Sequence, residues 1–105
     1  MPDTFVEGKT QDLWIEFKYI TKLPAKDSTI IDLCNPSKYL SALQQLWLKR
    51  RNAVRGDTLV ILGHPEGCVL YWKLEWEKKL SKKELLNKTI PRKNAVQIVR
   101  DKINE

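Results

Sequence analysis

Hydrophobic and polar side chains alternate most clearly along residues 13–19. Leu13, Ile15, Phe17 and Tyr19 fall on one side of an extended chain, whereas Asp12, Trp14, Glu16 and Lys18 fall on the other. A period of two residues is typical of a β-strand with one buried face. Residues 3–7 and 13–20 flank the sequence Gly8-Lys9-Thr10-Gln11, which is typical of a hairpin turn. We therefore predict a hairpin of two strands at the start of the chain.

A helical pattern follows a polar loop over residues 24–35. The helix is predicted to begin at Pro36 or at Ser41, because Ser41 and Gln44 have the spacing of a capping box. It is predicted to end at Gly56. At about 100° per residue, one arc of this helix is apolar and is expected to pack against a sheet. The arc consists of Tyr39, Leu40, Leu43, Leu46, Trp47 and Val54.

The second half of the chain adds two strands and two helices to the prediction. Residues 58–62 and 68–72 are apolar runs on either side of a turn at 63–67. Ser81 and Glu84 match a second capping box, which opens a short lysine-rich helix. The last helix has an apolar stripe, which consists of Ala95, Val96, Val99 and Ile103. The order β-β-α-β-β-α, in which the last α stands for both of these helices, predicts an α/β fold with a mixed β-sheet sandwiched by helices.

Length and charge limit the classes of protein to consider. A chain of 105 residues is expected to form a single domain, with a core over about residues 2–72 and a basic helical extension over about residues 73–105. The longest stretch without an acidic or basic residue is residues 39–48, ten residues, about half of what a membrane-spanning helix needs. The first residues also lack the apolar segment of a secretory signal. We expect an intracellular protein without a membrane partner.

The positive charge is concentrated in two segments. The formal net charge is +6, yet residues 33–56 contain five basic and no acidic residues, and residues 72–93 contain eight basic and three acidic ones. Such a distribution, in a chain with four tryptophans, indicates a polyanionic partner such as a nucleic acid. The alternative is that these lysines and arginines form a solvated surface without a specific partner.

Glu16, Phe17 and Lys18 place an acid and an amine on the same face of the second predicted strand. Two residues along a strand span about 7 Å. A carboxylate at this position can bind a hard cation, and the ammonium beside it can approach a phosphate or an attacking water. The same spacing occurs twice elsewhere in the chain, where a surface ion pair explains it. The difference here is Asp3, because the preceding strand can bring its carboxylate to the same cation as Glu16.

These residues resemble the signature of the PD-(D/E)XK nuclease superfamily. Pro2-Asp3 begins one strand and Glu16-Phe17-Lys18 lies on the next. Within the superfamily, the chain is most similar to the VRR-NUC domain and to similar small phage endonucleases, in which a helix with a Gln-x-x-Trp motif follows. Ser41, Gln44, Trp47 and Leu48 match that helix. The resemblance covers roughly residues 2–71 and implies a restriction-endonuclease-like core.

The resemblance also implies an activity, which is Mg²⁺-dependent hydrolysis of phosphodiester bonds in DNA, with Mn²⁺ as a substitute metal. It implies that Asp3 and Glu16 bind the metal together with the backbone carbonyl of Phe17. Lys18 would help to activate water or stabilise the developing charge, and Gln44 would be an auxiliary polar residue of the site. The alternative for Gln44 is a structural role in the capping box alone.

DNA contacts are expected along one edge of the predicted helix. Gln44, Arg51 and Arg55 lie within a stripe of about 40°, and Lys49 and Arg50 add positive charge beside it. If both Arg51 and Arg55 follow a phosphate backbone, replacing both should lower the salt dependence of binding by about two counterions.

The sequence also allows two alternatives to an endonuclease. One is a nucleic-acid-binding module without activity or a subunit of a larger nuclease, and the other is a basic domain associated with RNA or the ribosome. Trp14 is a candidate for stacking on a base, with packing in the core as the alternative. His64 is expected to be an exposed turn residue.

VRR-NUC domains usually begin with a helix before the Pro-Asp strand, whereas Pro2 follows directly on Met1 here. We therefore expect another element to cover one face of the sheet. The candidates are the last helix of the chain and a second copy in a homodimer.

Overall fold

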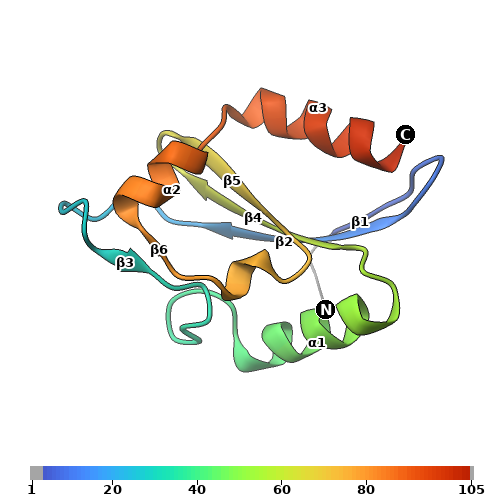
Figure 1. Cartoon of the computed structure of the whole chain (residues 1–105), viewed down its shortest axis with the longest axis horizontal. Coiled ribbons are helices and arrows are strands. Elements are labelled where there is room, and N and C mark those ends of the chain that lie inside the picture. Colours follow the sequence, from blue (N-terminus) through green and yellow to red (C-terminus); the bar gives the residue numbers. More distant parts are fainter. Residues whose placement is uncertain (1–3, 105) are drawn as a thin grey trace.

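The computed structural model describes residues 4–104 and contains a mixed four-stranded sheet with helices on both faces (Figure 1). The strands are β1 (Thr4–Val6), β2 (Leu13–Tyr19), β4 (Thr58–His64) and β5 (Gly67–Trp72), in the spatial order β1-β2-β4-β5. β2 and β4 are parallel, and the two outer pairs are antiparallel. The predicted α/β class, the mixed sheet and the first hairpin are confirmed.

The helices lie on opposite sides of this sheet. In Figure 1, α1 (Ala42–Val54) lies below it and α3 (Arg92–Ile103) lies above it. Beside them, α2 (Lys82–Lys88) and the 3-10 turn η1 (Glu75–Glu77) accompany a second small sheet of β3 (Ile30–Ile31) and β6 (Leu80–Ser81). Two-residue strands are too short to show a period, so the sequence did not predict them. Within residues 4–104, no helix has the length and apolarity to cross a bilayer.

Each face of the sheet has its own hydrophobic cluster. The cluster on the α3 face consists of Leu13, Ile15, Leu59, Val99 and Ile103. The cluster on the other face includes Leu48 of α1 and Val60 of β4. The segment predicted as an extension contributes to both clusters, with Trp76 and Leu85 fully buried in the second one. Residues beyond Trp72 are therefore part of the core.

Helix boundaries follow the local signals in the sequence. Ser41 is the N-cap of α1, and its hydroxyl accepts a hydrogen bond from Gln44 N (3.1 Å). Ser81 forms the equivalent capping box with Glu84 at the start of α2. Gly56 follows α1 with a φ of 67°, a left-handed conformation that glycine adopts without strain. Both predicted capping boxes and the end of α1 are confirmed, and Ser41 rather than Pro36 begins the helix.

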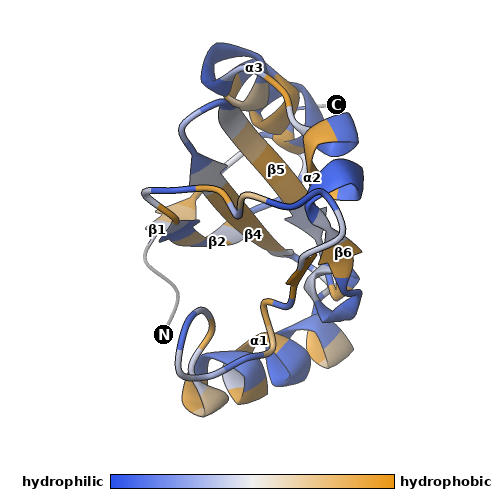
Figure 2. Ribbon diagram, turned by 90° about the vertical axis from the view of Figure 1, so that its left-hand side faces the viewer, coloured by the Kyte–Doolittle hydropathy of each residue, from blue (hydrophilic) through white to orange (hydrophobic). Residues whose placement is uncertain are grey.

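The predicted apolar arc is correct for Tyr39, Leu40 and Trp47, which lie in or against the cluster on this face, and wrong for Leu43, Leu46 and Val54. Leu43 is 71% exposed and Val54 is 76% exposed, whereas Leu48 is 1% exposed. Figure 2 shows hydrophobic residues along the outer side of α1, away from the sheet. Tyr39 and Leu40 precede the N-cap, so their burial does not determine which side of α1 faces the sheet.

The turn between β1 and β2 covers the C-terminal end of α3. The carbonyl of Ile103 accepts hydrogen bonds from Thr10 N (3.0 Å) and from the Thr10 hydroxyl (3.0 Å). Gln11 Nε2 donates to the carbonyl of Lys102 (3.0 Å). A side chain on Gly8 would collide with the backbone of Ile103, so glycine permits this close approach. The turn thus satisfies carbonyls that a helix leaves without partners at its end.

His64 is also placed differently from the prediction. It is the last residue of β4 and has 0% exposure, because the strand continues two residues beyond the predicted end at Leu62. Its Nδ1 accepts a hydrogen bond from Glu66 N (3.2 Å), so its Nε2 carries the proton and donates to the hydroxyl of Thr89 (2.9 Å). His64 is a buried structural residue that joins the β4–β5 turn to the end of α2.

Candidate metal and nucleic-acid site

Among the acidic residues within 4–104, Glu16 is the most deeply buried. It is 1% exposed and lies opposite Val60 in the parallel pairing of β2 with β4. Lys18, opposite Leu62, is half-buried and lies two residues further along the same face of β2. Acidic side chains are almost never fully buried without a specific reason. The strand therefore presents a carboxylate and an amine on the face that α1 covers.

An aromatic contact places α1 over β2. The ring centroids of Trp14 and Trp47 are 5.6 Å apart in an edge-to-face arrangement. Only a short turn joins the end of α1 to β4, so α1 runs antiparallel to β4 and to its parallel neighbour β2. Gln44 lies about one helical turn before Trp47, and Glu16 lies two residues after Trp14. Because α1 and β2 run in opposite directions, both residues lie on the same side of the Trp14–Trp47 contact. This direction predicts that Gln44 lies near the level of Glu16 along the sheet.

The carboxamide of Gln44 completes the capping box. Its Oε1 accepts a hydrogen bond from Ser41 N (2.9 Å). The structural role is therefore confirmed, and the auxiliary role in a catalytic site stays a prediction. A capping Gln keeps its amide group fixed at the start of α1, on the side of the helix that is not fully exposed.

The side of α1 that faces the protein is largely polar. Gln45 Nε2 donates to the carbonyls of Cys34 (2.9 Å) and Leu40 (2.8 Å), and these bonds fix the preceding loop. Asn52 Oδ1 is buried and has no hydrogen-bond partner among the described residues. The exposed side carries Leu43, Leu46 and Val54 together with Lys49 and Arg50, so apolar side chains are not confined to the inner side as they are in an ordinary surface helix. Sequence reasoning missed the polar residues of the inner side, because it searched for the apolar stripe.

The ligand set implied by the resemblance is described in part. The antiparallel register pairs Thr4 with Ile15, and Asp3 lies outside the described residues. Phe17, whose carbonyl is the third predicted ligand, follows Glu16 on β2. Within residues 4–104, no group of three His, Cys, Asp or Glu side chains could bind a metal. The described part of the site supplies one buried carboxylate, and oxygen is the donor that Mg²⁺ prefers.

Arg51 is held in an ion pair rather than presented freely. Its Nε and Nη2 donate to the two carboxylate oxygens of Asp57 at 2.9 and 2.8 Å. These hydrogen bonds raise the pKa of the guanidinium. Asp57 begins the connection to β4 and is 9% exposed, so the pair ties the end of α1 to the sheet. The carboxylate of Asp57 thereby largely neutralises the positive charge of Arg51.

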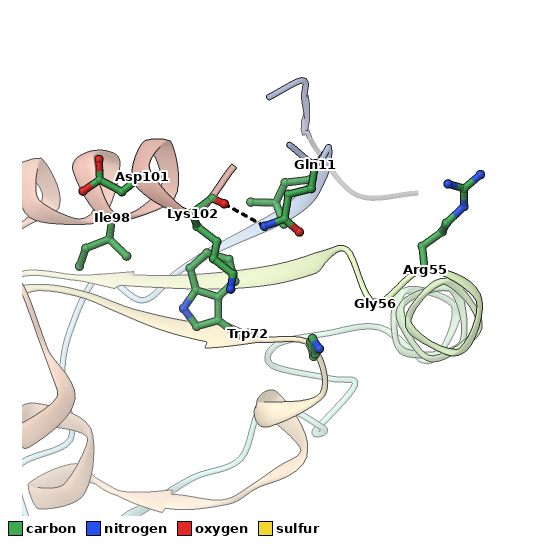
Figure 3. A pocket seen from close by; sticks show the side chains of 9 residues that line it. Gln11, Arg55, Gly56, Trp72, Ile98, Asp101 and Lys102 are labelled. Carbon is green, nitrogen blue, oxygen red and sulfur yellow. Dashed lines mark hydrogen bonds between the residues drawn. The ribbon is translucent and has the colours of Figure 1, made fainter. Parts of the chain in front are cut away.

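The other predicted phosphate contacts lie at the surface. Lys49 forms an exposed ion pair with Glu77 (3.4 Å), and Arg50 is exposed. Arg55 extends from the end of α1 beside a cavity of about 530 Å³, opposite Lys102 and Gln11 (Figure 3). Of the two arginines predicted to follow a phosphate backbone, Arg55 is the exposed one.

Phe5 is a residue that the sequence analysis did not select. It lies opposite Trp14 in the β1–β2 pairing, and the two ring centroids are 4.5 Å apart. Trp14 also contacts Trp47, so the three rings form a continuous row whose most exposed member is Phe5. The signal that could have found Phe5 is the alternation of β1, read together with the hairpin register.

Neither cysteine shows the character of an activated nucleophile. Cys34 and Cys68 are free thiols, and burial is the main cause that raises the pKa of each. A thiol with a raised pKa is less often the reactive thiolate at neutral pH.

Comparison with known proteins adds no relative to these observations. No family model, curated protein or solved structure matches the chain. The functional assignment therefore depends on the residues themselves and on the resemblance of their motifs.

Proposed function

We propose that this protein is a Mg²⁺-dependent DNA endonuclease of the PD-(D/E)XK type, with a restriction-endonuclease-like core. The observation that carries the proposal is the burial of Glu16 beside Lys18 under α1. A structural ion pair of surface residues does not need this position, whereas a metal ligand in a site shielded from water does. The parallel β2–β4 pair with α1 between them in sequence supports the same interpretation.

The residues of the chain would divide the work as follows. Glu16 would bind the cation together with Asp3 and the carbonyl of Phe17. A bound Mg²⁺ supplies an activated water and neutralises charge at the scissile phosphate. The ammonium of Lys18 would stabilise the negative charge that develops on the phosphate oxygens. Gln44, fixed by Ser41, would orient a polar partner at the level of Glu16.

Arg50 and Arg55 would contact the phosphates on either side of the cleaved bond. Both are exposed and belong to the acid-free segment of the chain. Contacts of this kind give affinity without sequence preference, and they weaken as salt concentration rises.

The test is incubation of plasmid DNA and branched DNA with the full chain, with Mg²⁺ and with EDTA. Cleavage that requires Mg²⁺ supports the endonuclease. Binding of DNA without cleavage at any metal concentration overturns it in favour of the non-catalytic module. Tight binding to structured RNA, with neither binding nor cleavage of DNA, overturns it in favour of the RNA-associated domain.

A further inference from the structure

Phe5, Trp14 and Trp47 form an aromatic row that runs from the surface to the underside of α1. Phe5 is 39% exposed, and Trp14 and Trp47 are half-buried. The planes of Phe5 and Trp14 are tilted by 48°, and those of Trp14 and Trp47 by 73°. The inner two rings pack the helix on the sheet, whereas Phe5 contacts Trp14 and keeps part of its ring surface in solvent.

A polar cavity of about 640 Å³ adjoins the outer end of this row. Phe5 and Trp14 line it together with the β1–β2 turn and the end of α1. Its charged lining residues are Lys9, Asp12, Arg51, Arg55 and Asp57. Because Arg51 and Asp57 are paired, Lys9 and Arg55 exceed the remaining acid by one positive charge. The cavity lies in the volume range of ligand-binding sites, about 300–1,000 Å³.

The row is close to the proposed catalytic residues. Trp14 and Glu16 are two residues apart on the same face of β2, a distance of about 7 Å. Successive nucleotides of a strand are about 3.4 Å apart along a stacked axis. The 7 Å between Trp14 and Glu16 corresponds to about two such steps, so a base at Phe5, beside Trp14, and a phosphate near Glu16 would be about two nucleotides apart on one strand.

We propose that Phe5 is a stacking site for an unpaired DNA base near the cleaved bond, and this rests on the proposed function for DNA as the substrate. Stacking requires the open face of a base. In a duplex the neighbouring pairs cover both faces, whereas a single-stranded segment or a displaced end leaves them free. Phe5 would then favour DNA with unpaired bases, while Arg55 and Lys9 contact its phosphates.

The experiment measures binding of labelled single-stranded and duplex oligonucleotides of equal length by fluorescence anisotropy, in EDTA so that no cleavage occurs. Phe5→Ala should weaken binding of the single strand about tenfold more than binding of the duplex. Phe5→Leu keeps an apolar contact with Trp14 but has no ring, and it should show the same selective loss. Circular dichroism establishes that each variant is folded.

Tyr19→Ala is the matched control. Tyr19 is an aromatic residue of the same strand, is 56% exposed, and lies on the face opposite to Trp14. Its loss should leave the single-strand preference as it is in the parent chain. A single strand that lacks one base at the contacted position should bind the parent chain as weakly as the intact strand binds Phe5→Ala.

Two results would overturn the stacking site. One is an equal loss for single-stranded and duplex DNA in folded Phe5→Leu, and the other is a loss in Tyr19→Ala as large as that in Phe5→Ala. The proposed function fails separately, if the parent chain does not cleave DNA in Mg²⁺. Such a result would leave the stacking measurement in EDTA unaffected.

Discussion

Glu16 is the residue on which the proposed chemistry depends. Glu16→Gln removes the negative charge that binds a cation and keeps the shape of the side chain. Lys18→Ala removes the ammonium that stabilises charge on the phosphate. Each change should reduce DNA cleavage on the order of 10²-fold or more, because the contributions act in the transition state. The measurement is the rate of plasmid nicking at saturating Mg²⁺.

Folding of these two variants is the necessary control. Circular dichroism and urea unfolding should show a folded protein in both cases. Cleavage at the parent rate by either folded variant would contradict the site assignment, and so would cleavage that persists in EDTA.

His64 makes the stability of the fold dependent on pH. Its pKa is lowered from the usual 6.5 because burial disfavours the charged ring, while Glu66 opposes this effect and Arg92 adds to it. The unfolded chain therefore binds a proton that the folded chain resists. The free energy of unfolding should fall as pH decreases below 6.5, by at most about 1.4 kcal/mol per pH unit.

Urea unfolding at about pH 7.5 and about pH 5.5 measures this effect. His64→Gln should be less stable than the parent at neutral pH, because it loses hydrogen bonds to Glu66 or Thr89. Its stability should also depend less on pH over this interval. An identical pH dependence in the two proteins would assign the effect to other groups.

At the scale of elements, two arginines at the end of α1 have different roles, one in stability and one in the proposed DNA binding. Arg51 pairs with Asp57 and holds the helix to β4, whereas Arg55 is exposed. Arg55→Ala should lower the slope of log binding constant against log salt by about 1. Arg51→Ala should instead reduce the free energy of unfolding by about 1–3 kcal/mol, because it leaves the nearly buried carboxylate of Asp57 without this partner.

DNA titrations at several salt concentrations and urea unfolding test the two arginines independently. The sequence predicted that Arg51 and Arg55 together release two counterions on DNA binding. Because Arg51 is paired with Asp57, we now expect only the one from Arg55. A full loss of slope by two in the double variant, with no loss of stability in Arg51→Ala, would show that the ion pair with Asp57 does not hold Arg51 in solution.

At the scale of the whole molecule, α3 covers the sheet face opposite to α1. Ala95, Val99 and Ile103 are buried, whereas Val96 of the predicted stripe is 53% exposed. The last helix is thus the cover that the sequence analysis named as one of two candidates. An apolar groove of about 490 Å³ remains beside it, and Val96 and Tyr19 are among its lining residues. The homodimer stays a prediction, which light scattering at micromolar concentration tests.

Removal of α3 should unfold the protein. Truncation after Thr89 exposes one hydrophobic cluster and removes the backbone bonds between Ile90 and Cys68 (2.9 and 3.0 Å). Circular dichroism should show loss of the β-sheet signal and a loss of cooperative urea unfolding. Truncation after Ile103 is the control and should stay folded, because it keeps every buried residue of α3. A folded chain after truncation at Thr89 would show that another element covers this face.

The features that the sequence predicted correctly depend on residues close to one another in the chain. The alternation of β2 places Glu16 and Lys18 on one face whatever lies opposite them. The capping boxes at Ser41 and Ser81 involve residues three apart, and the glycine after α1 acts on the turn that it ends. Each of these patterns has its physical cause within about four residues, so it can be recognised without knowledge of the tertiary contacts, with which it agrees here.

Only the tertiary structure decided what each face contacts. Periodicity groups the residues of α1 by side, but the side that packs is the one with Trp47 on Trp14 and Leu48 in the core, and Leu43 is left in solvent. Burial of His64 depends on Thr89, 25 residues away. The position of Phe5 beside Trp14 depends on the register of the β1–β2 pairing. These outcomes depend on packing between distant segments, for which a local pattern contains no information.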